Sequence, residues 1–501
     1  MTAPHETGPV EELDPVVPGE LAAFEEEFAP EAEATGRTPL VVKLLVAATF
    51  VVILNETITI NAIPRLKEHF GITDSSAQWV TTIFMLTMAA VIPLTGWFLQ
   101  RVSTRTAYAA AMITFCTGTL VAAVAPAFGV LLVGRMIQAS GTAVMMPLLM
   151  TTLMTVVPPH DRGRVMGNVT LAMSVAPALG PAVSGLVLQL GSWRLIFAVV
   201  LPIAMLVGYF GFRLVENVGE TKVTSVSWVS VVLAASGFGG LVYGLSKIGH
   251  AAWQEPTLII GAGVLLVAVF AANQIRLQRS GTPLLDLRTL THSTYRTSLV
   301  LMAAAFMGFF GSMLLLPLYL QGVRGLSPLE CGLVVMPGGL AMGLLGPQVG
   351  KLYDRFGSRP LVIPGSIGMV AMLVGLSQVT TTTPYALIVL MHVLLMTSLA
   401  AIFTPVFSLG LGDLPPELYS HGSSLLGTLQ QVAGAVGTAL LVVIETNRSA
   451  GLLESGSSID EAFVGGMQWA LLASAGIGLI VVAMALLLPA RVEPADPHVG
   501  H

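Results

Sequence analysis

The amino-acid sequence predicts an all-α membrane protein in which fourteen spanning helices form two six-helix halves with two further helices inserted between them. Hydrophobic residues make up 54% of the 501 positions and charged residues only 10%, with a mean hydropathy of +0.81. Soluble domains carry about 25% charged residues. The other two observations are a series of long apolar runs and a loop pattern that occurs twice. Nothing in this composition supports binding to nucleic acid.

The number of spans follows from the length of the apolar runs. A helix needs about 20 mainly apolar residues to cross a hydrocarbon layer of about 30 Å. We expect spans near residues 40–63, 76–99, 107–126, 129–155, 165–190, 195–215, 226–246, 256–277, 297–321, 328–350, 361–379, 384–411, 423–445 and 464–489. An even number of spans places both termini on the same side of the membrane. The acidic tail before them is expected to be disordered, although "GELAAFEEEFAP" also permits a short amphipathic helix.

The distribution of basic residues predicts which side this is. With a cytoplasmic N-terminus, sixteen Lys and Arg residues fall in cytoplasmic segments and six in outer segments. This bias satisfies the positive-inside rule, and the reverse orientation violates it. The remaining cation, Arg135, lies within the fourth expected span. We therefore expect a multi-pass protein of the bacterial cytoplasmic membrane with both termini in the cytoplasm.

The repeated loop pattern predicts the domain organisation. "GWFLQRVSTR" (96–105) and "GKLYDRFGSR" (350–359) share glycine and arginine positions, and Gln100 stands where the second copy has Asp354. Eight spans separate these equivalent points, as expected for parallel six-helix halves with two helices between them. The predicted segments are a cytoplasmic tail (1–39), a first bundle (40–215), a linker with two spans (216–290), a second bundle (291–489) and a C-terminal cytoplasmic tail (490–501).

Glu56 is an acid within the otherwise apolar first span, in "VVILNETITINAIP". A carboxylate near the bilayer interior costs about 2.5–3.5 kcal/mol, so it pairs with a cation, faces a cavity or binds a proton. At 1.5 Å per residue, Glu56 and Arg135 both lie about 10 Å below the outer surface. We predict a switchable pair in which protonation of Glu56 releases Arg135. One alternative is that Glu56 stays protonated and only forms a hydrogen bond between helices. The other is that Arg135 is static and binds carbonyl groups at helix ends.

Further candidates concern substrate contact and gating. Substrate contact is predicted for Asn55, Gln138, His392, Met145 and Met313, although hydrogen bonds between helices, a structural histidine and ordinary packing explain these residues equally simply. Gly180, Pro181 and Gly185 permit a bend and close helix approach, with or without a role in gating. The repeated loops are expected to latch the two halves, or only to mark topology, through Gly96, Arg101, Arg105, Gly350, Asp354 and Arg355.

Several of these motifs occur in the order found in a known family. The sequence contains, in order, "LNET", the loop "GWFLQRVSTR", "RMIQASG", "ALGPAVSG", "PLYLQGVRGLSP", "GKLYDRFGSR" and "HGSSLLGTLQQVAGAVG". From about Leu40 to Pro489 the chain thereby resembles the fourteen-helix drug:proton antiporters of the major facilitator superfamily. The first loop departs from the family pattern at Gln100 and Ser103.

This resemblance implies a proton-coupled antiporter that exports lipophilic or cationic small molecules by alternating access, in contact with membrane lipids and as a monomer. Glu56 would carry the proton and Arg135 would modulate it. No nucleotide-binding loop or metal-spaced cluster occurs in the sequence, so we expect no cofactor. The alternatives are an exporter dedicated to one metabolite, amino acid or lipid, and a polytopic membrane enzyme.

Overall fold

The computed structural model describes residues 38–491 except 61, 219–220, 222–225, 249–252 and 281. The predicted tails, 1–39 and 490–501, therefore lie almost entirely outside the described residues. Fourteen helices in the described part of the chain are long and apolar enough to cross a membrane, which confirms the predicted number of spans.

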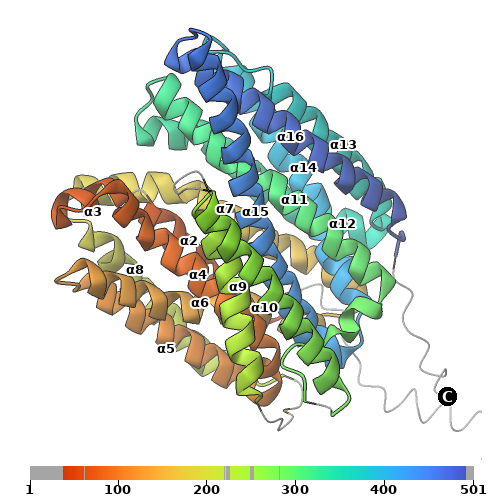
Figure 1. The fold of residues 1–501 in the computed structure, drawn as a ribbon. Coiled ribbons are helices and arrows are strands. Elements are labelled where there is room, and N and C mark those ends of the chain that lie inside the picture. Colours follow the sequence, from red (N-terminus) through yellow and green to blue (C-terminus); the bar gives the residue numbers. More distant parts are fainter. Residues whose placement is uncertain are drawn as a thin grey trace, which may run out of the picture. The chain divides into compact units, whose positions relative to one another are not determined.

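The long helices follow one another with short connections (Figure 1). Their bounds are α2 Leu40–Ile60, α4 Asp74–Arg101, α5 Thr104–Ala123, α6 Phe128–Val156, α7 Arg162–Gln189, α8 Arg194–Leu214, α9 Trp228–Ser246, α10 Gln254–Gln278, α11 Ser293–Leu318, α12 Pro328–Phe356, α13 Arg359–Leu376, α14 Tyr385–Gly412, α15 Tyr419–Glu454 and α16 Ile459–Leu487. Short elements are α3 Ile63–Phe70, a π-helix Tyr319–Val323 and 3-10 turns Pro159–Asp161, Leu287–Thr291 and Pro416–Leu418.

Several helix ends differ from the predicted spans because local capping sets them. The third span begins at Thr104, three residues early, since the Ser103 side chain accepts a hydrogen bond from Thr106 N. A capping box of Ser458 and Glu461 likewise starts α16 at Ile459. Apolar runs therefore locate the membrane-crossing part of a helix better than its ends.

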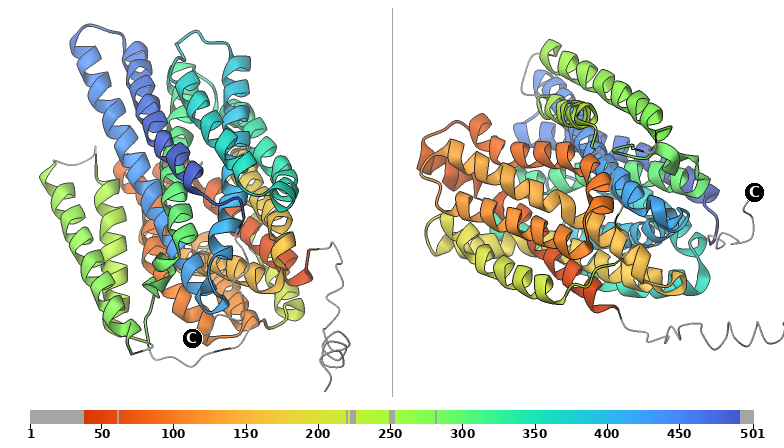
Figure 2. Two further views of the ribbon diagram at one scale, coloured as in Figure 1. Left: turned by 90° about the vertical axis from the view of Figure 1, so that its right-hand side faces the viewer. Right: turned by 90° about the horizontal axis from the view of Figure 1, so that it is seen from below.

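The helices pack as two groups with one pair beside them. α2 and α4–α8 pack against one another and form the first bundle, and α11–α16 form the second bundle. The inserted helices α9 and α10 lie together on one side of the molecule (Figure 2, left), where α9 contacts both α4 and α15. The bundles meet along two lines, which we call the α7–α12 seam and the α4–α15 seam.

Both seams are closed at the end that carries the arginine-rich loops, which we call the basic end. On the α7–α12 seam, a Cβ on Gly346 would lie 2.7 Å from the carbonyl oxygen of Gly167, so the two backbones touch. Further from the basic end, a Cβ on Gly185 would lie 3.9 Å from Leu329, an ordinary contact. The described hydrogen bonds between the bundles also lie toward the basic end, and include Thr170 to Thr404 at 2.9 Å.

We predict that Gly167→Ile opens the α7–α12 seam without unfolding either bundle. A Cβ on Gly167 would lie 2.6 Å from Gly346 C, and overpacking of this kind costs about 1–3 kcal/mol. The ratio of open to closed molecules should rise about 5- to 150-fold. Spin labels on the exposed residues Thr155 and Lys351, one on each bundle, would measure this change.

The matched control is Gly261→Ile on α10, where a Cβ would meet no atom within 4 Å. An unchanged distance distribution in Gly167→Ile would contradict the role given to this contact.

Candidate functional site

A buried arginine organises the interior of the first bundle. Arg135 on α6 is fully buried, and its Nη1 donates to Gln138 Oε1 at 2.6 Å and to Asn55 Oδ1 at 3.4 Å. Its Nε donates to the carbonyl of Val80 on α4 at 3.2 Å, and the guanidinium lies 4.1 Å from the ring centroid of Phe84. The structure thus brings together Arg135, Asn55 and Gln138, which the sequence analysis singled out separately.

Two donors of this cluster have no hydrogen-bond partner among the described residues. They are Arg135 Nη2 and Asn55 Nδ2, and both belong to fully buried side chains. Gln138, in contrast, is satisfied, because its Nε2 donates to Thr119 Oγ1 at 2.8 Å. Buried polar groups rarely lack partners. The cluster is therefore short of an acceptor, and an incoming oxygen atom would satisfy it.

Glu56 lies next to Asn55 on α2 and is the nearby acid. Its side chain is partly exposed, unlike those of Asn55 and Arg135. The carboxyl interacts electrostatically with Arg135, but the two side chains form none of the ion pairs found in the described part of the chain. In this structure Arg135 is held by neutral acceptors, with the acid close by.

The Gly-Pro motif of α7 packs beside this acid. A Cβ on Gly180 would lie 2.5 Å from Oγ1 of Thr57, so the missing side chain lets α7 approach α2 directly after Glu56. Gly185 makes only the loose contact with α12 described above, and the side chain of Pro181 lies outside the described residues. The described close contact of the motif is therefore within the first bundle.

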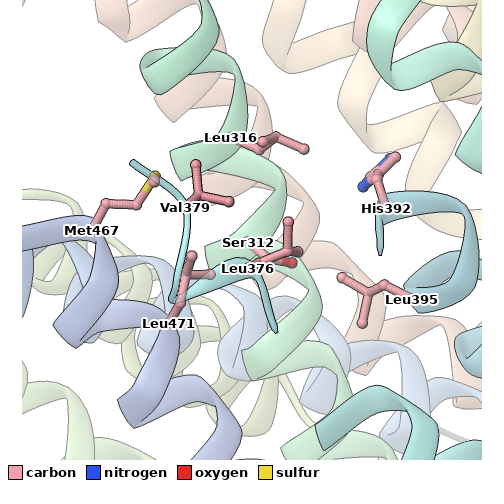
Figure 3. Close-up of a pocket in the computed structure, with 8 residues that line it drawn as sticks. All are labelled: Ser312, Leu316, Leu376, Val379, His392, Leu395, Met467 and Leu471. Carbon is pink, nitrogen blue, oxygen red and sulfur yellow. The ribbon is translucent and has the colours of Figure 1, made fainter. Parts of the chain in front are cut away.

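The other predicted substrate residues lie elsewhere. Met145 is fully buried in the core of the first bundle, and Met313 on α11 is half-buried. His392 on α14 is 6% exposed, hydrogen-bonds the backbone of Val335, and borders a small cavity inside the second bundle (Figure 3). The other residues that line this cavity are Ser312, Leu316, Leu376, Val379, Leu395, Met467 and Leu471. The structure does not bring these three residues to the Arg135 cluster.

The second copy of the loop pattern joins the bundles at the basic end. The Asp354 carboxylate accepts hydrogen bonds from Gly163 N at 2.8 Å and Arg164 N at 2.7 Å. These amides belong to the first turn of α7, where a carboxylate is favoured by both hydrogen bonding and the helix dipole. Gly350 permits this approach, because a side chain there would collide with the Gly163 backbone. The Asp354 carboxylate of the second bundle thus caps the first turn of α7 in the first bundle.

The first copy makes a weaker, neutral contact. Gln100 Nε2 donates to the carbonyl of Glu417 at 2.9 Å, just before α15, and Gly96 packs against His421. Because glutamine replaces the aspartate here, the link lacks the charge that strengthens the Asp354 contact. The two seams are therefore closed by different chemistry.

The arginines of the two loops act mainly within their own bundles. Arg105 Nε donates to the carbonyl of Phe212 at 2.6 Å, and Arg355 lies over the ring of Phe356. Arg101 lies over Trp97 of its own helix. The contacts described for Arg105 and Arg355, and the ring contact of Arg101, therefore each lie within a single bundle.

Sequence reasoning treated Arg162 only as a topology marker and missed its position. Its Nη2 donates to the carbonyl of Met154 at 2.7 Å and to Tyr419 Oη at 3.2 Å. Arg162 thereby joins the end of α6 to the start of α15 in the second bundle. The predicted fifth span began at residue 165, so Arg162 was placed before the helix, and its contact with Tyr419 comes from a segment 257 residues away.

We predict that Gln138→Leu destabilises the protein by about 1.5–3 kcal/mol, because it removes a hydrogen bond to a buried charge. Thermal unfolding in detergent would measure the loss. The control is Ser140→Ala on the same helix, whose exposed hydroxyl bonds only to the carbonyl of Met136. Equal melting temperatures for both variants would contradict this account of Arg135.

We predict that Asp354→Ala shifts the free-energy difference between the closed and open basic end by about 0.5–2 kcal/mol toward the open state. This is the usual cost of losing an N-terminal helix cap. Labels at Thr155 and Lys351 would show a larger open fraction. Asp161→Ala serves as control, because Asp161 pairs with Arg164 at 3.3 Å within the first bundle. A larger effect of the control would remove Asp354 as the latch.

Comparisons with known proteins agree with this architecture. The family model described as Major Facilitator Superfamily matches residues 45–438. An uncharacterized MFS-type transporter of Bacillus subtilis, YcnB, is 36% identical over 91% of this chain and 96% of its own length. The lincomycin resistance protein LmrB of Listeria monocytogenes is 34% identical over 91% of this chain and 98% of its own.

Among solved structures, the proton:xylose symporter XylE has the same fold, with a TM-score of 0.62 over 89% of this chain and 94% of XylE. Its sequence identity is only 16%, so this likeness concerns the fold. The matched family model covers most of the fourteen-helix region, and it confirms the family predicted from the motifs. The chain belongs to the major facilitator superfamily and is a multi-pass membrane transporter.

Proposed function

We propose that this transporter is a proton-coupled antiporter that exports lipophilic or cationic small molecules. The name of the LmrB relative, a lincomycin resistance protein, supports an exported drug-like substrate. The observation that carries the proton coupling is the Arg135 cluster, in which a buried guanidinium has an unsatisfied donor and an acid beside it. No described feature favours a dedicated metabolite, amino acid or lipid exporter over this substrate class.

The cluster suggests how one proton changes the conformation. A deprotonated Glu56 would bind the free donors of Arg135 and Asn55 and satisfy both. Protonation of Glu56 would remove the charge that holds it there, leaving Arg135 with the neutral acceptors seen in this structure. Gln138 keeps the guanidinium in place in either case. The proton would therefore select between two arrangements of α2 against α6.

Movement of the bundles would connect this change to transport. We propose that segments 40–215 and 291–489 move as two units, with 216–290 carrying the inserted helices. If the basic end is cytoplasmic, as the distribution of Lys and Arg favours, the closed seams correspond to the state that receives protons from outside. The protein would then act as a monomer in the cytoplasmic membrane, with both termini in the cytoplasm and lipids around it.

We predict that Glu56→Gln abolishes substrate export driven by a pH gradient, because the amide cannot exchange a proton. Proteoliposomes with an imposed pH gradient and a panel of lipophilic cations and neutral drugs would measure this. Binding of substrate should persist. The control is Glu454→Gln at the exposed end of α15, which should transport as the wild type does. Retention of gradient-driven export by Glu56→Gln would refute the proposed coupling.

A further inference from the structure

A buried histidine lies on the α4–α15 seam and takes no part in the mechanism above. His421 is in the first turn of α15, its side chain is 3% exposed, and its Nδ1 has no hydrogen-bond partner among the described residues. A Cβ on Gly96 of α4 would lie 2.8 Å from this nitrogen. The backbone of α4 in the first bundle therefore closes one side of the imidazole.

The charged groups that interact with the imidazole come from the segment between α10 and α11. They are Asp286 and Arg288. Burial alone would raise the pKa of Asp286, but hydrogen bonds from Arg288 and its charge outweigh burial and lower that pKa. The Asp286 carboxylate also accepts a hydrogen bond from Gln278 Nε2 at 2.9 Å. From α11 the neighbouring titratable group is the neutral hydroxyl of Tyr295, which donates to the carbonyl of Gly422 on α15. The residue of α4 that packs against the imidazole is Gly96, which carries no titratable group.

The inserted helices hold this segment across both bundles. Gln274 of α10 accepts hydrogen bonds from Leu284 N at 2.8 Å and Leu285 N at 3.2 Å. These leucines belong to an apolar cluster that also includes Trp97 of α4 and Leu425 of α15. Asp286 is 2% exposed and is thereby fixed in place. The surroundings of His421 combine α4, α15 and the segment that follows the inserted helices.

We propose that His421 is a proton sensor of the α4–α15 seam, and that a proton on its imidazole opposes closure of the basic end. Closing the seam on a protonated imidazole would bury a charge, which is costly unless that charge is paired. The Asp286 carboxylate attracts an imidazolium more strongly than Arg288 repels it, but Arg288 and Gln278 already engage this carboxylate, and the cost of burying the charge is the largest of the three effects. An exposed histidine titrates near pH 6.5, so the open seam would take up protons in an acidified cytoplasm.

The sign of the effect follows from these two states. Because the enclosed site disfavours the imidazolium, the closed state is most favoured above about pH 6.5 and becomes progressively less favoured as the pH falls below that value. Between about pH 7.5 and about pH 5.5, the ratio of open to closed molecules should rise about tenfold. This inference concerns regulation and does not depend on Glu56.

The test uses spin labels at Thr155 and Lys351 in the full chain, with Cys116 and Cys331 replaced by serine. All variants carry Glu56→Gln, so that the acid of the proposed coupling site does not contribute. Distance distributions are measured at about pH 7.5 and about pH 5.5. The tenfold shift should be present with His421, absent in His421→Gln, and retained in His392→Gln, which changes the buried histidine inside the second bundle.

Persistence of the shift in His421→Gln would overturn the proposal, as would a shift toward the closed state at the lower pH. If His421→Gln does not fold, His421→Asn provides a second neutral amide at the same position and is judged by the same criterion. Because Glu56 is absent throughout, failure of this proposal and failure of the proton-coupling proposal give separate results.

Discussion

The contact between the glycine backbones of α7 and α12 is the constraint on which the closed basic end depends. At Gly167 and Gly346 the two helices approach until main-chain atoms touch, and at Gly163 and Gly350 the same happens one turn nearer the loops. Only with the helices this close can the Asp354 carboxylate reach the first amides of α7. Dispersion and small-residue packing hold this contact, since the lipid removes the usual hydrophobic drive between helices.

The α4–α15 seam is closed by different contacts from those of the α7–α12 seam. The two copies of the repeated loop are therefore not equivalent. Around α4 and α15, a neutral glutamine replaces the charged cap, and α9 packs along the contact. The inserted helices also hold the segment that carries Asp286 against both bundles. They therefore belong to the structure of one seam, although the sequence analysis placed them only between the two halves.

The Arg135 cluster lies inside the first bundle and shares no described hydrogen bond with the two seams. Its acceptors come from α2, α4 and α6, so any change in how α2 lies against α6 changes the surroundings of the guanidinium. In the proposed mechanism, a proton at Glu56 would act on helix packing without direct contact with the second bundle. The same mechanism would require the seams at the basic end to open or close in response to this movement.

The sequence by itself determined the number of spans, the family and the identity of the unusual polar residues. Apolar run length is a local property, and Glu56 and Arg135 stand out because charge is costly in a helix that must cross lipid. The sequence also predicted that both residues lie at a similar depth, because helix rise per residue is constant, and the two groups do interact electrostatically.

Only the tertiary structure decided which residues touch. It gave Arg135 neutral partners instead of an ion pair with Glu56, placed His392 inside the second bundle, and made Asp354 a cap across the seam. It also revealed Arg162 and His421, each of which has a partner more than 100 residues away in the chain. Such contacts depend on rotation of each helix about its axis and on close approach at glycines, and neither is encoded by the local pattern of hydropathy.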